Sequence, residues 1–184
     1  MRVFAVIALL AGCITYGFVH AEVSGIGNRS TSYQGSLQLG SESHGECRFT
    51  VTLDPVLFQL HTLLGKYRVV RINVANTSDK LVVLSHNADH VKVSLGKGRD
   101  VAAIIDMQQA DPGVWDQLSS SARKALAYPK SIPAGDEVAV GRLSQMSFFI
   151  FLPAEVATLP ASFELVIDSM HKSVSIAPPP ATAA

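Results

Sequence analysis

The sequence predicts a mostly β protein, an antiparallel sandwich of about seven to nine strands. Apolar and polar residues alternate with a period of two over several short segments, and turns rich in Gly, Pro and Asn separate these segments. The chain also lacks the regular alternation of strands and helices that parallel sheets need. We therefore expect two packed antiparallel sheets.

Residues 1–21 are similar to a secretory signal peptide. Arg2 supplies a positive charge, Val3 to Phe18 carry none, and small residues stand at Val19 and Ala21. The apolar run is shorter than the roughly 20 residues that a membrane-spanning helix needs. We expect cleavage after Ala21 and export to the periplasm or the medium.

Cys13 offers an alternative as a lipidation candidate. Leu10-Ala-Gly-Cys13 resembles the lipobox of bacterial lipoproteins, in which the cysteine is diacylated and anchors the chain to a membrane. That cleavage would leave the apolar Ile14 to Phe18 in a tether where polar residues are usual. Cleavage after Ala21 is favoured, and both routes stay open.

The expected mature chain has 163 of the 184 residues, with 14 basic and 15 acidic side chains. This length suits one domain with a real core. Because no basic stripe is present, nucleic acid is not an expected partner. We divide the chain into a signal peptide (1–21), a flexible lead-in (22–35), one sandwich domain (36–176) and a disordered Pro/Ala tail (177–184).

Strands are expected wherever the alternation is clearest. They fall at 37–39, 47–53, 70–74, 81–84, 91–95, 101–107, 138–140, 148–152, 163–167 and, as a final edge strand, 174–176. The uninterrupted apolar run at 81–84 is typical of a strand buried on both faces. In the segment headed by Cys47, the cysteine shares the apolar face, which predicts a buried and inert thiol.

Two segments interrupt the strands with helix signals. Asp54-Pro55 is a cap followed by proline, and it permits a short helix over 55–64 that Gly65 would end. Asp111-Pro112 is a second cap followed by proline. After it, Trp115 and Leu118 begin a run of apolar residues at helical spacing. We predict a helical insert over 111–128 that lies on the sandwich with both of these side chains buried.

Three stretches resemble the immunoglobulin-like modules of bacterial secreted proteins and lipoproteins. They are a hairpin with an Asn-Thr-Ser turn (67–84), the turn Ile132-Pro-Ala-Gly-Asp-Glu137, and the strand Phe148-Phe-Ile-Phe-Leu-Pro153. The resemblance covers about half of the mature chain, by this count of matched stretches. It implies an immunoglobulin-like sandwich that serves as a non-catalytic spacer or binding domain, and it assigns no active-site residue.

Residues that carry chemistry are sparse. His86, Asp89 and His90 could hold a metal ion, but in a loop between strands their spacing fixes no geometry, so an ordinary solvated loop is the favoured reading. No nucleophile elbow or phosphate-binding loop is present, so no catalytic residue and no cofactor are predicted. The sequence thus predicts a non-enzymatic exported module with another envelope protein as partner. The alternative is a periplasmic metal-binding protein.

Overall fold

The computed structural model describes residues 30–39, 45–78, 80, 82–85, 90–128, 137–140, 144–167 and 171–179. Within these ranges the side chains of 83–85, 90, 137–140 and 167 are not described. The predicted signal peptide, Cys13 and most of the lead-in therefore lie outside the described residues.

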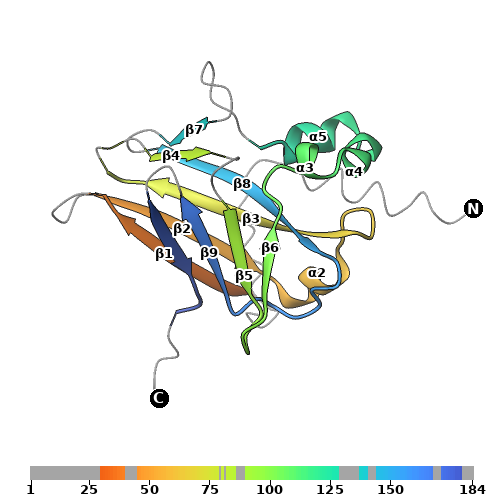
Figure 1. Ribbon diagram of the computed structural model, residues 1–184, viewed down its shortest axis with the longest axis horizontal. Coiled ribbons are helices and arrows are strands. Elements are labelled where there is room, and N and C mark those ends of the chain that lie inside the picture. The colour runs from red at the N-terminus through yellow and green to blue at the C-terminus, as the bar shows by residue number, and fades with distance from the viewer. Residues whose placement is uncertain are drawn as a thin grey trace, which may run out of the picture.

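Eight strands form two antiparallel four-stranded sheets (Figure 1). One sheet has the order β1 (Thr31–Gln38), β2 (Glu46–Leu53), β3 (Tyr67–Asn76), β8 (Ser144–Pro153). The other has the order β10 (Lys172–Ile176), β9 (Ser162–Ile167), β5 (His90–Ser94), β6 (Asp100–Ala103). A separate two-stranded ribbon joins β4 (Val82–Ser85) to β7 (Glu137–Val140). The predicted antiparallel two-sheet architecture is confirmed.

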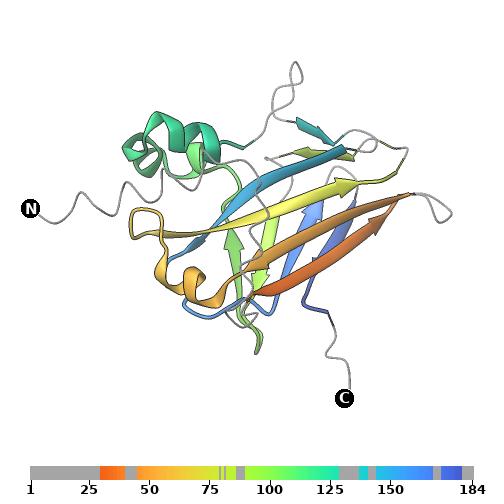
Figure 2. The ribbon, with the colours of Figure 1, turned by 180° about the vertical axis from the view of Figure 1, so that it is seen from behind.

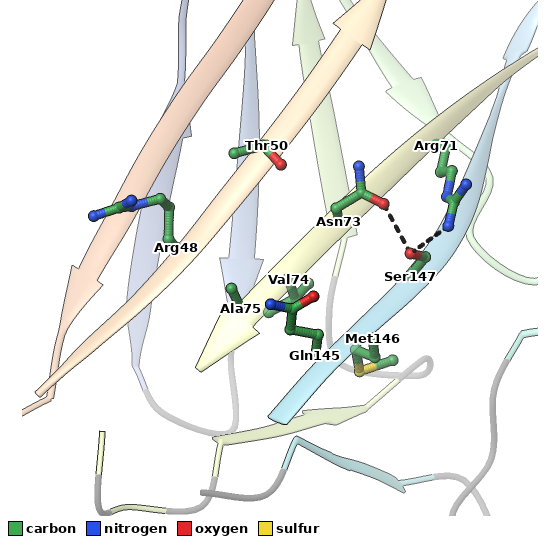
Figure 3. Close-up of a pocket in the computed structure, with 9 residues that line it drawn as sticks. All are labelled: Arg48, Thr50, Arg71, Asn73, Val74, Ala75, Gln145, Met146 and Ser147. Carbon is green, nitrogen blue, oxygen red and sulfur yellow. Dashed lines mark hydrogen bonds between the residues drawn. The ribbon is translucent and has the colours of Figure 1, made fainter. Parts of the chain in front are cut away.

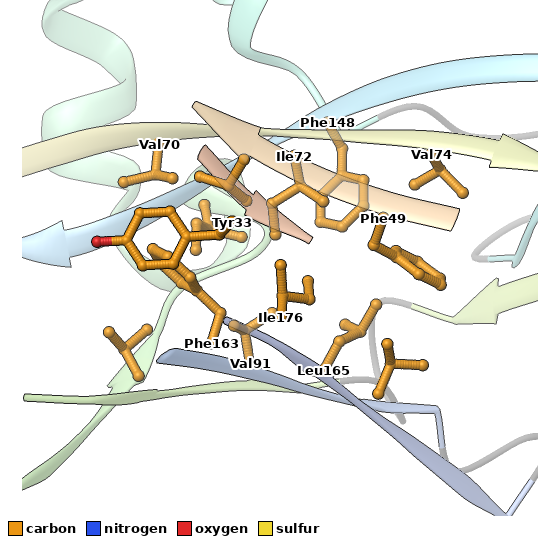
Figure 4. Close-up of a cluster of buried hydrophobic side chains, with 14 of the residues drawn as sticks. Tyr33, Phe49, Val70, Ile72, Val74, Val91, Phe148, Phe163, Leu165 and Ile176 are labelled. Atoms are coloured by element: carbon orange, nitrogen blue, oxygen red, sulfur yellow. The ribbon is translucent and has the colours of Figure 1, made fainter. Parts of the chain in front are cut away.

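The core lies between the inner faces of the two sheets (Figure 4). On β2 the alternation of burial is complete, because every second side chain from Cys47 to Leu53 is buried. Phe49 and Ile72 of one sheet face Phe163 and Leu165 of the other. Tyr33 meets the ring of Phe163 edge-on at 5.2 Å between centroids, and its hydroxyl donates to the Pro160 carbonyl at 2.8 Å. A buried hydroxyl is thereby satisfied.

Backbone hydrogen bonds also join the two sheets at both edges. Gln34 and Ala177 exchange N–H···O bonds of 2.8 and 3.1 Å between β1 and the end of β10. Ile104 and Phe151 exchange two bonds of 2.9 Å at the opposite edge. Gly35 permits the first junction, since a Cβ there would lie 2.3 Å from the Ser175 carbonyl oxygen. The sandwich is therefore closed on itself, which shields sheet edges that could otherwise pair with another chain.

The helical insert is broken into three short helices, which corrects the single helix expected over 111–128. They are α3 (Met107–Ala110), α4 (Pro112–Gln117) and α5 (Ser120–Leu126). Each helix has its own N-cap, because the side chains of Asp106, Asp111 and Ser119 accept backbone N–H groups. These side-chain acceptors compete with the hydrogen bonds that would continue the preceding helix, so a new helix begins after each of them.

The insert packs on the outer face of β3 and β8, as Figures 1 and 2 show. Trp115 and Leu118 are buried there against Phe151, together with Met107 and Val114. The predicted burial of Trp115 and Leu118 is confirmed. It also explains why β8 is apolar on both faces: Phe148 and Ile150 face the core between the sheets, while Phe151 lies under the helices.

Asp111 fixes the start of α4 relative to the sheet. Its carboxylate accepts the Val114 N–H at 3.1 Å and the Tyr67 hydroxyl at 3.0 Å. These two hydrogen bonds lower the pKa of Asp111 below its usual value, because both favour the ionised form.

The short helix α2 spans Pro55–Leu60 and ends earlier than the expected range of 55–64. His61 is already extended, and the left-handed turn follows at Leu64 and Gly65. Arg68 accounts for the early end. Its buried guanidinium donates to the carbonyls of Phe58 and Gln59, which are then satisfied without a further helical turn.

Two further expectations differ from the structure. Ten strands are found in the described part of the chain, one more than the nine expected at most, and each of them overlaps a segment where the alternation predicted a strand. Strand β1 begins at Thr31, inside the range 22–35 expected to be a flexible lead-in. The polar residues that suggested a linker occupy its outward face.

Candidate binding surface

The alternative metal site at His86, Asp89 and His90 falls mostly outside the described residues. His86 and Asp89 lie outside the described residues, and His90 begins β5 with a side chain that is not described. Among the residues that the structure does describe, no group of three or more His, Cys, Asp or Glu side chains is placed to hold a metal ion.

Cys47 occupies the predicted inward position on β2 and is fully buried. Burial and, to a smaller extent, the neighbouring Glu46 carboxylate together raise the pKa of its thiol to about 11. A thiol is reactive as its thiolate, so the environment of Cys47 suppresses nucleophilic and redox chemistry. The expectation of a buried structural cysteine is confirmed.

A basin of about 520 Å³ lies on the outer face of β2, β3 and β8 (Figure 3). It occupies the part of this sheet that the helical insert leaves open. The residues that line it are Arg48, Thr50, Arg71, Asn73, Val74, Ala75, Gln145, Met146 and Ser147. We call this set the arginine basin. Its side chains offer guanidinium, amide and hydroxyl groups, and none of the nine is a histidine, a cysteine or a carboxylate.

Strand register assembles the arginine basin. Thr50 pairs with Asn73, and Asn73 pairs with Ser147, so three adjacent strands place these polar side chains in one row. Arg48, Ala75 and Gln145 form the next row. Thr50 and Ala75 are small, and their short side chains form a low floor between the longer side chains.

Hydrogen bonds fix one wall of the basin. Arg71 Nη2 donates to Ser147 Oγ at 3.0 Å, and Ser147 Oγ donates to Asn73 Oδ1 at 2.8 Å (Figure 3). This relay holds a guanidinium in place, which reduces the conformational entropy lost when a ligand is bound.

Arg48 forms the opposite wall. Its Nη2 lies 3.1 Å from Glu46 Oε2, with the Arg48 side chain 58% exposed. Hydrogen bonds from Arg48 and Ser36 lower the pKa of Glu46. An exposed pair of this kind contributes little to stability and can exchange its carboxylate for that of a ligand.

Sequence reasoning did not identify this surface. Its members stand at outward positions of three strands that are far apart in the chain, and each one looks like an ordinary solvated residue. The site can be recognised only once the strand register is known, because the register shows that Arg48 and Arg71 lie on either side of the row formed by Thr50, Asn73 and Ser147.

Among the described residues, no helix combines the length and the apolar character that crossing a membrane requires. Comparisons with protein-family models, with curated proteins and with solved structures find no match to this chain.

Proposed function

We propose that this protein is a non-enzymatic, exported immunoglobulin-like module that binds another envelope protein through the arginine basin. The protein is similar to immunoglobulin-like modules in its architecture, which is two antiparallel sheets packed around one core. The strand order differs from the simple module, because β2 and β3 are neighbours in one sheet here, whereas the second immunoglobulin strand pairs with the fifth.

The observation that carries the proposal is the pair of arginines on an open sheet face. Arginine forms planar, two-pronged hydrogen bonds with carboxylates, and it is enriched at protein interfaces. Arg71 is already positioned by Ser147, and Arg48 can exchange partners. The matching partner is a protein segment that presents acidic side chains. The lining groups suit recognition better than proton transfer, which supports a binding role over an enzymatic one.

A crosslinking experiment in the producing cell tests this function. A photo-reactive amino acid at Gln145, which lines the arginine basin, should give a discrete adduct with an envelope protein. Reversing the charge with Arg71→Glu should remove that adduct. The matched control is Lys124→Glu, a charge reversal on the exposed α5, which should leave the adduct unchanged.

Two results would overturn the proposal. One is the absence of any adduct from Gln145 in cells where the protein is present at its normal level. The other is an adduct that persists at full yield in the Arg71→Glu variant, since the interface would then not involve the basin. If binding is confirmed, charge reversal should also lower the association rate and its dependence on salt.

A further inference from the structure

The strand register sets the spacing of the two arginines that border the basin. Arg48 pairs with Ala75, and Arg71 lies four residues before Ala75 on the same strand. Strands rise about 3.3 Å per residue and lie about 5 Å apart. The two Cα atoms are therefore separated by about 13 Å along the strands and by about 5 Å across them. The basin carries two positive charges at a defined spacing.

The contacts of the two side chains preserve this spacing. Arg71 donates to Ser147, which stands in the row of Asn73, so it leans along the strands toward the middle of the basin. Arg48 leans in the same direction, because its Nη2 lies 3.1 Å from Glu46 Oε2, two residues farther along. Each guanidinium is displaced by one row in the same sense, so about 13 Å still separates them along the strands.

Arg48 already binds a carboxylate in the folded chain. The side chains of Arg48 and Glu46 are 58% and 27% exposed, and an ion pair so open to solvent contributes little to stability. A carboxylate from another chain can therefore take the place of Glu46 at the same guanidinium. Because Arg71 offers the same planar donor group on the other side of the basin, we expect the basin to accept two carboxylates.

Short side chains form a low path between the two arginines. Asn73 is drawn toward β8, since its Oδ1 accepts from Ser147 at 2.8 Å, and so away from Thr50 on β2 (Figure 3). Thr50 and Ala75 line the basin, and neither has a long side chain. A peptide segment can therefore lie over them while its acidic side chains reach the arginines.

An extended segment matches the spacing of the arginines, whereas a helix does not. In an extended chain, side chains four residues apart point to the same face and are separated by about 13 Å. On a helix, side chains return to the same face after seven and eleven residues, which are about 10 Å and about 16 Å along the axis. Neighbouring side chains of an extended chain point to opposite faces, so only one of two adjacent acidic residues can reach the basin.

We propose that the arginine basin binds an extended segment of its protein partner in which two acidic side chains stand four residues apart. This inference rests on the proposed function and adds the conformation and the charge spacing of the partner segment. The residue midway between the two acidic ones points to the same face and lies over Thr50, so a short side chain is expected there.

Synthetic peptides test the spacing on the exported protein. Two Gly/Ser peptides of equal composition each contain two glutamates, four residues apart in one and adjacent in the other, and fluorescence anisotropy at low salt measures their binding. The first peptide should bind about tenfold more tightly, because it alone engages both arginines. Arg48→Gln or Arg71→Gln should remove this difference. The matched control is Lys92→Gln, at an exposed position of β5 on the other sheet, which should retain it.

An exchange of charges gives a second measurement. Arg48→Glu should bind the first peptide weakly, and replacing one particular glutamate of that peptide by lysine should restore binding about tenfold. The inference is overturned if the two spacings bind equally, if neither peptide binds at millimolar concentration, or if neither lysine peptide restores binding to Arg48→Glu. The crosslink from Gln145 tests the proposed function separately. An adduct that depends on Arg71, found together with equal binding of the two peptides, would keep the basin as the interface and reject only the extended segment.

Discussion

At the scale of single residues, Gly35 is the position on which closure of the sandwich depends. A side chain there would meet backbone atoms of β10, with the first contact at 2.3 Å, and strands cannot yield as a flexible side chain does. We expect Gly35→Ala to separate β1 from β10, to weaken the Gln34–Ala177 bonds, and to lower the free energy of unfolding by about 2–3 kcal/mol. Urea denaturation measures this change.

Gly113→Ala is the control for the glycine substitution. A Cβ at Gly113 would meet only the Asp111 carboxylate oxygen, at an ordinary 3.5 Å, and alanine favours a helix more than glycine does. That variant should be as stable as the parent protein or slightly more stable. Equal stability of Gly35→Ala and Gly113→Ala would show that β1 and β10 are not in close contact in solution.

Cys47 makes stability depend on pH in the alkaline range. The thiol of the unfolded chain ionises above about pH 8.5, while burial keeps the folded thiol protonated up to a pKa of about 11. The folded state then binds more protons than the unfolded state. The contribution of this group to the free energy of unfolding is complete below pH 8.5, and about 3 kcal/mol of it is lost as the pH rises to 11.

Comparison with Cys47→Ala isolates this contribution, because the other titrating groups are shared. We expect the variant to be less stable at neutral pH, because a buried side chain is shortened, but its stability should fall less steeply between pH 8.5 and 11. Parallel pH profiles for the two proteins, measured by urea denaturation, would contradict a raised pKa for Cys47.

At the scale of elements, the helical insert behaves as a lid on one half of a sheet. Trp115 is its central contact, buried between α4 and the outer face of β8 with Phe151 and Met107. Trp115→Ala removes this contact and should lower the free energy of unfolding by about 3–5 kcal/mol. Thermal and urea unfolding followed by circular dichroism measure the loss.

Asp116→Ala tests whether the effect is specific to the buried residue. Asp116 is the next residue of α4, with its side chain 77% exposed and an Arg123 nitrogen 3.8 Å away. Exposed pairs of this kind contribute at most about 1 kcal/mol, so the midpoint should hardly move. A Trp115→Ala protein that melts like Asp116→Ala would mean that the insert does not pack on β8 in solution.

Local patterns predicted elements well where one rule dominates. The alternation from Cys47 to Leu53 indicates both the strand and its buried face, and Asp111-Pro112 marks the start of a helix. Local sequence patterns failed to predict where an element ends when a contact with a distant residue determines that end. Arg68 ends α2 by binding carbonyls ten and nine residues earlier, and no local signal announces that contact.

At the scale of the whole molecule, the sequence indicates two sheets but not how they are joined. The pairings of Gln34 with Ala177 and of Ile104 with Phe151 connect segments far apart in the chain. The arginine basin follows from the same long-range register, since Thr50, Asn73 and Ser147 become neighbours only in the folded sheet. The periodicity of the sequence predicts which side chains of a strand are buried, but it does not predict the arginine basin.

The form of the whole protein in the cell depends on the N-terminal segment. We expect the mature chain to begin at Glu22, because Ile14 to Phe18 would make an unusually apolar tether. Cys13→Ser should then change neither the mass of the mature protein nor its distribution between soluble and membrane fractions. Mass spectrometry that finds a diacylated Cys13 would instead establish a lipoprotein.

The hydrogen bonds between Gln34 and Ala177 have a mechanical consequence. They place the entrance of the fold at Thr31 and its exit past Ala177 side by side on one edge. Tension applied to the two ends would open β1 and β10 like a zipper, loading one pair of hydrogen bonds at a time rather than many strands in parallel. The folded domain would also add almost no length to a tether. A domain whose two ends leave on the same edge is poorly suited to span a gap under load.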